Sequence, residues 1–278
     1  MREFFGFGGY IREAEGYLSW QHLLFVTILV TAAVLLAVSL GRRNRTRPLS
    51  CRNRVLIAAA ISIDTLELFK IVLLCFRSHD AMNWLYNLPL FLCSIQLIAL
   101  PLAAFSKGRV KDASLDFVSI FGVLGMILGT YGAGNNYSAY PVLSFDNVVS
   151  GVTHAISGFA SLYILISGMA SLKKRNILLT FAILTAFCAA AYAADLLIPY
   201  NYMFLIRGDG TPYDIVFNAV NGNPVLYPLC VVGLFLIYIA VFYLLVFALR
   251  GKRTWNKNLG ETPVQAEETE AIRDAVTL

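Results

Sequence analysis

The chain has 278 residues, of which 58% are hydrophobic and 14% charged, and its formal net charge is +5. A soluble globular domain usually carries about 25% charged residues, so this composition excludes an ordinary water-soluble domain, and its hydrophobicity excludes a disordered chain. Five cysteines are too few for a secreted module held together by disulfides. A lipid bilayer is the solvent that fits this composition.

Apolar runs alternate with short charged segments along the chain, and each run approaches the ~20 residues that a helix needs to cross the hydrocarbon core. We therefore expect an all-α polytopic membrane protein, a bundle of seven transmembrane helices. The predicted spans are residues 20–40, 55–76, 88–105, 115–131, 148–170, 177–199 and 225–249. Residues 1–19 form a segment before the seven-helix domain of residues 20–249, and residues 250–278 form a polar tail after it.

Basic residues set the expected orientation, because short loops retained in the cytoplasm accumulate Lys and Arg. They cluster in residues 42–54, 107–111 and 173–175, three loops on one side of the predicted bundle, and again after residue 249. The N-terminus is therefore expected outside and the tail in the cytoplasm, in a multi-pass plasma-membrane protein. Since topology accounts for the positive charge, membrane lipids are the expected partners and nucleic acid is not; the oligomeric state is left open.

The second predicted span contains three charged side chains on one helix face. Asp64, Glu67 and Lys70 follow one another at spacings of three, so Glu67 can pair with Lys70. Such charges are costly at membrane depth and commonly mark an interior site or pathway. A self-neutralising pair that only fixes helix packing is the alternative.

The third predicted span contains Cys93 between Pro89 and Pro101, with Ser94 and Gln96 close by. A membrane cysteine is commonly a small hydrophobic residue, and the four other cysteines of the chain show how unspecific the residue type is. The neighbouring polar residues and the two prolines distinguish Cys93 from the other four cysteines.

Glycines mark the fourth predicted span and a histidine marks the fifth. Gly122, Gly125 and Gly129 recur at spacings of three and four, a pattern typical of close helix approach. His154 lies among serines on one face of the fifth span, including Ser150 and Ser157, so that face is expected to point into the bundle.

Depth connects these side chains into one layer. At about 1.5 Å per residue, Cys93 and His154 are expected at the same level in the outer half of the membrane. Lys70, Glu67 and Asp195 reach a similar level on the outward-running second and sixth spans. No metal or cofactor is expected, because the sequence lacks a metal-ligand cluster, a phosphate loop and a dinucleotide motif.

A thiol and an imidazole at one level suit covalent acyl chemistry, because the imidazole can take the thiol proton and leave a nucleophilic thiolate. Glu67 or Asp195 is a candidate to orient the imidazole, and Gln96, Asn201 or a backbone amide is a candidate donor to an oxyanion. The same layer is also compatible with a proton or ion relay.

Four short motifs resemble the YwaF-like bacterial integral membrane proteins. They are Leu-Pro-Leu-Phe-Leu-Cys ending at Cys93, Gly-Val-Thr-His ending at His154, Asn-Tyr-Met-Phe-Leu starting at Asn201, and Gly-Asn-Pro-Val-Leu-Tyr-Pro starting at Gly222. That family is distantly similar to a mammalian seven-span acyltransferase that remodels ether-linked phospholipids. The resemblance implies that Cys93 is the nucleophile and His154 the base. Phe91 departs from the family pattern, which usually has a histidine there, and this puts the family activity in doubt.

The leading hypothesis is an integral membrane enzyme of lipid acyl transfer or acyl hydrolysis. Two alternatives remain: a transporter or channel for ions or small solutes that uses the same polar layer, and a non-catalytic lipid-binding protein. The absence of an inverted repeat in the sequence weighs against a transporter.

Overall fold

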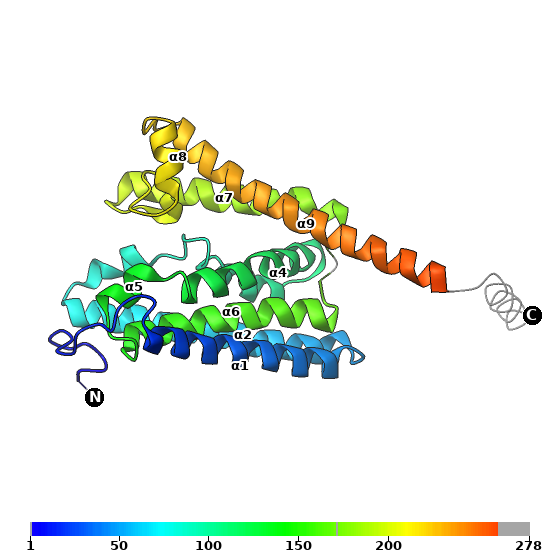
Figure 1. Cartoon of the computed structure of the whole chain (residues 1–278), viewed down its shortest axis with the longest axis horizontal. Helices are drawn as coiled ribbons and strands as arrows, with labels where there is room; N and C mark the ends of the chain where they lie inside the picture. The colour runs from blue at the N-terminus through cyan, green and yellow to red at the C-terminus, as the bar shows by residue number, and fades with distance from the viewer. Residues whose placement is uncertain (1, 171, 261–278) are drawn as a thin grey trace, which may run out of the picture. The chain divides into compact units, whose positions relative to one another are not determined.

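The computed structural model describes residues 2–170 and 172–260, and within these ranges all regular structure is helical, as the sequence predicts (Figure 1). The longer helices are α1 (Trp20–Asn44), α2 (Leu49–Ser78), α3 (Gln96–Phe105), α4 (Gly108–Thr130), α6 (Phe145–Ser167), α7 (Lys174–Leu197) and α9 (Leu226–Gly260). The short ones are η1 (Ala81–Asn87), α5 (Gly134–Ala139), η2 (Tyr202–Phe204) and α8 (Tyr213–Ala219). The predicted tail begins inside α9, and its residues 261–278 lie outside the described residues.

Five helical segments are long and apolar enough to cross a membrane. They are Trp20–Asn44, Gly108–Ala139, Phe145–Ser167, Asn176–Leu197 and Leu226–Ala248. The other two predicted spans, residues 55–76 and 88–105, do not form helices that are both long and apolar enough to cross a membrane. Helix α2 has 30 residues but carries charged side chains along its length, and α3 has only 10.

Helix α6 is the centre of the packing, in contact with α1, α2 and α4 (Figure 1). All of this packing lies within the first of two compact units, Met1–Leu236; α9 from Ile237 onward belongs to the second. Most residues of α4 and α6 are buried. Apolar side chains on α1 are exposed instead, among them Ile28 at 58% and Leu35 at 64%. An apolar outer surface around a well-packed interior is the pattern expected where lipid replaces water.

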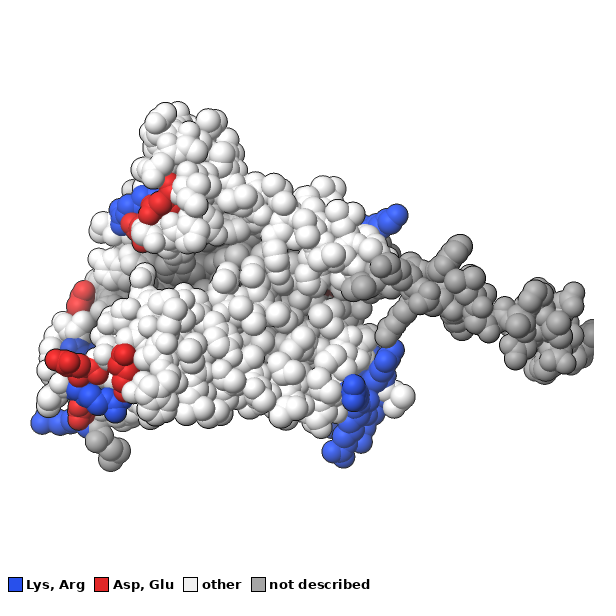
Figure 2. Space-filling model, viewed as in Figure 1, with Lys and Arg blue, Asp and Glu red and all other residues white. Residues whose placement is uncertain are grey.

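The distribution of charged side chains on the face shown in Figure 2 also fits a protein surrounded by lipid. Lys and Arg gather at the end where α1 finishes, and both signs of charge occur at the opposite end. The exposed arginines Arg42, Arg43, Arg45 and Arg47 belong to the first of these ends. The surface between the two ends carries almost no charged side chain on this face, as a lipid-facing surface requires (Figure 2).

The prediction of one continuous helix over residues 88–105 is wrong. Helix α3 begins at Gln96, and residues 88–95 form turns. Pro89 is the physical reason, because a residue that precedes proline is driven out of the helical region; Leu88 accordingly has φ −62° and ψ 149°. The ten residues of α3 rise only about 15 Å. Cys93 therefore lies on a turn, not on a transmembrane helix.

Helix α6 begins and ends three residues earlier than predicted. Ser144 caps its start by accepting a hydrogen bond from the backbone N–H of Asn147 at 3.3 Å. Gly168 ends it in the left-handed conformation, with φ +72°, which glycine adopts without a steric penalty. Because His154 remains within α6, the shift leaves it on a helix that is well fixed at both ends.

The glycines of α4 provide the close approach that their spacing predicts. A Cβ added to Gly122 would lie 2.6 Å from the carbonyl oxygen of Ser157 in α6, closer than real Cβ contacts allow. Ser161 of α6 also donates a 2.8 Å hydrogen bond to the carbonyl oxygen of Ser119 in α4. The small residues thus let the two helices touch at their backbones.

Candidate active site

Cys93 and His154 meet in the interior of the first unit. The thiol of Cys93, on the turn before α3, and the imidazole of His154, on α6, line the same cavity and interact with each other. Both side chains are partly buried and line one cavity of about 50 Å³. Two residues 61 positions apart in the sequence are thus brought to one place by the packing of α3 and α6 around α4.

A backbone carbonyl fixes the orientation of the His154 ring. The Nδ1 atom lies 2.7 Å from the carbonyl oxygen of Ser150, one turn earlier in α6. A carbonyl oxygen only accepts hydrogen bonds, so Nδ1 carries a proton and donates it. In the neutral ring the other nitrogen, Nε2, then has a free lone pair. The lone pair that can accept the proton of the Cys93 thiol is therefore on Nε2.

His22 shows what a structural histidine looks like in the same bundle. Its ring is fully buried and both of its nitrogens bond to the backbone: Nδ1 accepts from the N–H of Leu18 at 3.2 Å, and Nε2 faces the carbonyl oxygen of Thr130 at 3.1 Å. Neither nitrogen is left for chemistry. His154 differs because only Nδ1 of its ring bonds to the backbone, while the ring lines a cavity that it shares with the Cys93 thiol.

Gly129 of α4 provides the space that the His154 ring occupies. A Cβ added there would lie 1.9 Å from Cδ2 of the ring and 2.1 Å from Nε2. The Cys93 side is less crowded, since a Cβ on Gly125 would lie 3.7 Å from that of Cys93, an ordinary contact. The α4 glycines thus serve both helix packing and the placement of the imidazole.

Six further polar residues line the cavity shared by Cys93 and His154, among them Glu67, Lys70 and Ser157. Glu67 and Lys70 of α2 form the ion pair predicted from their spacing, so their charges cancel beside the site. Ser157, one turn after His154, is 3% exposed, and its hydroxyl has no hydrogen-bond partner. A buried hydroxyl without a partner is uncommon, and here it lies in the cavity wall.

Gln96, Asp195 and Asn201 do not line this cavity. Gln96 is fully buried in the first turn of α3, and neither atom of its amide has a hydrogen-bond partner. Asp195 on α7 accepts a 2.7 Å hydrogen bond from the backbone N–H of Tyr202. Asn201 donates to the carboxylate of Asp209 at 2.7 Å. Asp195 and Asn201 therefore organise the loop after α7, away from the thiol and the imidazole.

A sequence model of the TMEM164 family matches residues 17–255, which include every residue of the cavity described above. The chain belongs to the TMEM164 family. No curated protein and no solved structure matches it. Family membership and the five apolar helical segments identify this TMEM164-family chain as a multi-pass membrane protein. The motif resemblance to the YwaF-like proteins finds no support in the comparison.

A large vestibule leads to the site of this TMEM164-family protein. It has a volume of about 1420 Å³ and is lined by segments from α2, α4, α6 and the chain before α1. Cys93 and His154 lie in its wall, as do Lys70 and Arg77. Polar molecules therefore have room beside the thiol without crossing a packed helix.

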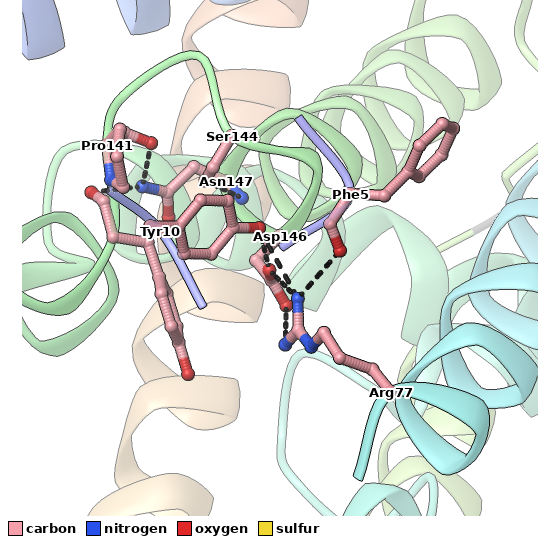
Figure 3. A network of polar contacts seen from close by, with 8 residues as sticks. Phe5, Tyr10, Arg77, Pro141, Ser144, Asp146 and Asn147 are labelled. Carbon is pink, nitrogen blue, oxygen red and sulfur yellow. Dashed lines mark hydrogen bonds and ion pairs between the residues drawn. The ribbon is translucent and has the colours of Figure 1, made fainter. Parts of the chain in front are cut away.

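The N-terminal segment is attached to this vestibule by a polar network (Figure 3). Arg77 at the end of α2 and Asp146 in the first turn of α6 form a two-pronged ion pair, with N–O distances of 2.6 and 3.0 Å. Tyr10 donates a hydrogen bond to the same carboxylate, and Arg77 donates one to the carbonyl oxygen of Phe5 at 3.3 Å. Burial and the bond to Asp146 raise the pKa of Tyr10 to about 12.

Sequence reasoning overlooked this network, because Arg77 and Asp146 are 69 positions apart and belong to different helices, α2 and α6. The one available signal was an acidic residue in the first turn of α6, where the helix dipole favours negative charge.

Tyr202 fixes the loop that leads to Cys93. Its hydroxyl donates to the carbonyl oxygen of Leu85 and accepts from the N–H of Leu88 at 3.2 Å. Phe91, which stands where the YwaF-like proteins usually have histidine, packs edge-on against the ring of Tyr202 with centroids 5.2 Å apart. Among the described residues, no group of three His, Cys, Asp or Glu side chains is placed to hold a metal ion.

Proposed function

We propose that this protein is a membrane-embedded lipid acyltransferase or acyl hydrolase in which Cys93 is the nucleophile and His154 the general base. The observation that carries the proposal is one cavity lined by both the Cys93 thiol and a histidine whose Nδ1 is held by the carbonyl oxygen of Ser150. A nucleophile, a base and an orienting group are the minimal parts of covalent acyl transfer. Here a backbone carbonyl takes the orienting role that the sequence suggested for Glu67 or Asp195.

In the first half-reaction, Nε2 of His154 takes the thiol proton and the Cys93 thiolate attacks the carbonyl carbon of a lipid ester. A carbon–sulfur bond forms and the carbonyl oxygen becomes an oxyanion. When the oxyanion collapses, the carbon–oxygen bond to the lysolipid breaks. The departing alkoxide receives the proton from the imidazolium, which leaves a thioester on Cys93 and a neutral His154.

In the second half-reaction, the hydroxyl of an acceptor lipid attacks the thioester while His154 takes its proton. The carbon–sulfur bond breaks and the imidazolium returns its proton to the sulfur. Water in place of the acceptor gives a free fatty acid by the same steps. Whether transfer or hydrolysis prevails depends on which hydroxyl occupies the vestibule, which is wide enough for a lipid headgroup at about 1420 Å³.

Ser157 is the donor that we assign to the oxyanion. Its hydroxyl is buried, lines the same cavity as the sulfur and the imidazole, and has no hydrogen-bond partner. A donor placed where charge develops commonly contributes a large share of acyl-transfer catalysis. Glu67 and Lys70 complete the cavity wall as a neutral pair, which avoids a net charge beside the reacting atoms.

The proposed topology has seven membrane crossings and the N-terminus outside. To the five apolar helical segments it adds α2 and the segment of residues 88–105, which crosses as a turn followed by the short helix α3. Its support is the clustering of arginines between α1 and α2 and of Lys and Arg at residues 107–111. The site then opens toward the outer leaflet of the plasma membrane. We assign the protein to a bacterial cell, on the motif resemblance alone.

The test is an acyl-transfer assay on the full chain in phosphatidylcholine nanodiscs that also contain an isotopically labelled lysophospholipid. Mass spectrometry follows the labelled diacyl product and released fatty acid. Cys93→Ala should abolish both products, and His154→Ala should lower the rate by about 10²–10⁴-fold, the usual contribution of a general base. Cys230→Ala, at another partly buried cysteine, is the matched control. Unchanged turnover in Cys93→Ala overturns the proposal.

A further inference from the structure

We propose that an apolar chamber next to Cys93 binds the hydrocarbon tail of the acyl group that Cys93 accepts. This inference rests on the proposed function and adds the part of the substrate that the site selects. The chamber has a volume of about 200 Å³. Its wall includes Leu124 and Leu128 from α4, Leu92 from the turn before Cys93, and Met203 from η2.

The chamber wall is almost entirely hydrocarbon. None of the side chains that line it is charged, and only Cys93 and Tyr213 among them carry a polar hydrogen. A polar molecule that entered would lose its hydrogen bonds to water without replacing them. A hydrocarbon chain loses nothing on entry and gains contacts with the wall. The chemistry of the wall therefore selects an alkyl chain.

Cys93 lies at the boundary between the chamber and the polar compartments. It lines the apolar chamber, the small cavity with His154, and the vestibule that contains Lys70 and Arg77. An ester lipid has the same order of parts, with a hydrocarbon tail, a carbonyl carbon and then a polar headgroup. Placing its carbonyl carbon at the sulfur puts the tail in the chamber and the headgroup in the vestibule.

Two glycines keep the passage between the sulfur and the chamber open. Gly125 and Gly129 both line the chamber beside Cys93. A Cβ on Gly125 would lie 3.7 Å from that of Cys93, so any side chain longer than methyl would extend into the space where the first carbons of the acyl chain must lie. The two α4 glycines therefore shape the chamber entrance as well as the helix interface.

Leu124 offers a way to change the chamber without touching the reacting groups. Its side chain lines the chamber but neither of the two polar cavities around Cys93 and His154. Ile127, on the same helix, is 42% exposed and lines none of the three cavities. Leu124→Phe narrows the chamber, Leu124→Ala enlarges it, and Ile127→Phe is the matched control with equal added volume.

The first arm of the test measures chain selection. The nanodiscs contain equal amounts of phosphatidylcholines with short, medium and long saturated chains, and mass spectrometry gives the chain profile of the transferred acyl groups. Leu124→Phe should shift the profile severalfold toward shorter chains and Leu124→Ala toward longer ones, while Ile127→Phe keeps the wild-type profile. An identical profile in all four proteins, with turnover intact, overturns the chamber assignment and leaves the proposed function standing.

The second arm measures binding without turnover. Palmitic acid with a diazirine near its terminal methyl is photolysed with Cys93→Ala protein in nanodiscs, and peptide mass spectrometry maps the adducts. Adducts on the chamber-lining residues Phe121, Leu124, Leu128, Met203 or Phe204, reduced severalfold by Leu124→Phe and displaced by unlabelled palmitic acid, support the chamber even if the acyl-transfer assay fails. Adducts confined to exposed positions such as Ile127, with no displacement, overturn it.

Discussion

Gly129 of α4 lies against the face of the His154 imidazole so closely that a single added carbon would take the place of the ring. The added Cβ would lie 1.9 Å from Cδ2 and 2.4 Å from Cγ of the ring. The position of the proposed general base is therefore set by two elements together, the Ser150 carbonyl that holds Nδ1 and a glycine on the neighbouring helix that leaves room for the ring.

This relationship predicts that Gly129→Ala impairs chemistry by displacing the imidazole. Acyl transfer should fall by about 10²-fold or more, toward the level of His154→Ala, and alkylation of Cys93 at neutral pH should slow with it. Gly233→Ala in α9 is the matched control, because a Cβ at Gly233 meets nothing within 4 Å. Normal acyl transfer by Gly129→Ala would show that the ring position is not needed for turnover.

Ser157→Ala should lower kcat more than it changes KM, because an oxyanion donor acts in the transition state. Loss of one such donor commonly costs about 10²–10³-fold in kcat. Ser161→Ala provides the contrast: its hydroxyl already bonds to the Ser119 carbonyl oxygen, so its loss should cost about 0.5–1.5 kcal/mol of stability and leave kcat unchanged. Steady-state kinetics and thermal unfolding of both variants separate the two roles, and equal kcat values in Ser157→Ala and wild type would exclude the oxyanion role.

Tyr202→Phe should loosen the segment that carries Cys93 without altering any group in the cavity. The change removes the hydroxyl shared by the Leu85 carbonyl and the Leu88 N–H, and it leaves that partly buried N–H without its bond, at a cost of about 1–3 kcal/mol. Hydrogen exchange of residues 85–93 should accelerate in the variant. Tyr200→Phe removes a neighbouring hydroxyl and serves as the control. Unaltered exchange in Tyr202→Phe would mean that the loop is held by other contacts.

Asp146→Asn should release the N-terminal segment. The substitution removes the charge that pairs with Arg77 and weakens the bond from Tyr10 (Figure 3). Hydrogen bonds to charged groups contribute about 1.5–3 kcal/mol, so residues 2–17 should become accessible to protease while α2 and α6 stay protected. Asp209→Asn, at a loop carboxylate bonded to Arg207, should leave the segment protected. Equal protection in wild type and Asp146→Asn would show that the aromatic contacts of Phe4 and Phe5 hold the segment unaided.

The helical class of the fold was predictable because the long apolar runs leave no alternative in a bilayer. Five of those runs coincide with helical segments able to span it. The prediction for the third run, residues 88–105, was wrong because hydropathy does not account for the effect of Pro89, which forces Leu88 out of the helical region. Composition alone gives the length of an apolar segment, whereas backbone chemistry decides where its helix starts.

The candidate site was predictable to the extent that it depends on depth and on spacing along a single helix. Cys93, His154, Glu67 and Lys70 all line the one cavity, and the pairing of Glu67 with Lys70 is confirmed. The partner of the His154 imidazole could not be predicted in this way. Its Nδ1 contacts the backbone carbonyl of Ser150, and Asp195, one of the expected partners, bonds to the backbone of Tyr202. Side-chain direction between helices depends on packing, which spacing along one helix does not reveal.

The most direct test of the central claim is to map where a lipid-like electrophile reacts with the full chain in nanodiscs. α-Bromopalmitate is applied at neutral pH, and peptide mass spectrometry compares labelling at Cys51, Cys75, Cys93, Cys188 and Cys230, the five free cysteines. We predict at least tenfold preference for Cys93, lost in both His154→Ala and Gly129→Ala. Equal labelling of the accessible cysteines, or Cys93 labelling that persists in His154→Ala, would contradict a thiolate activated by this histidine.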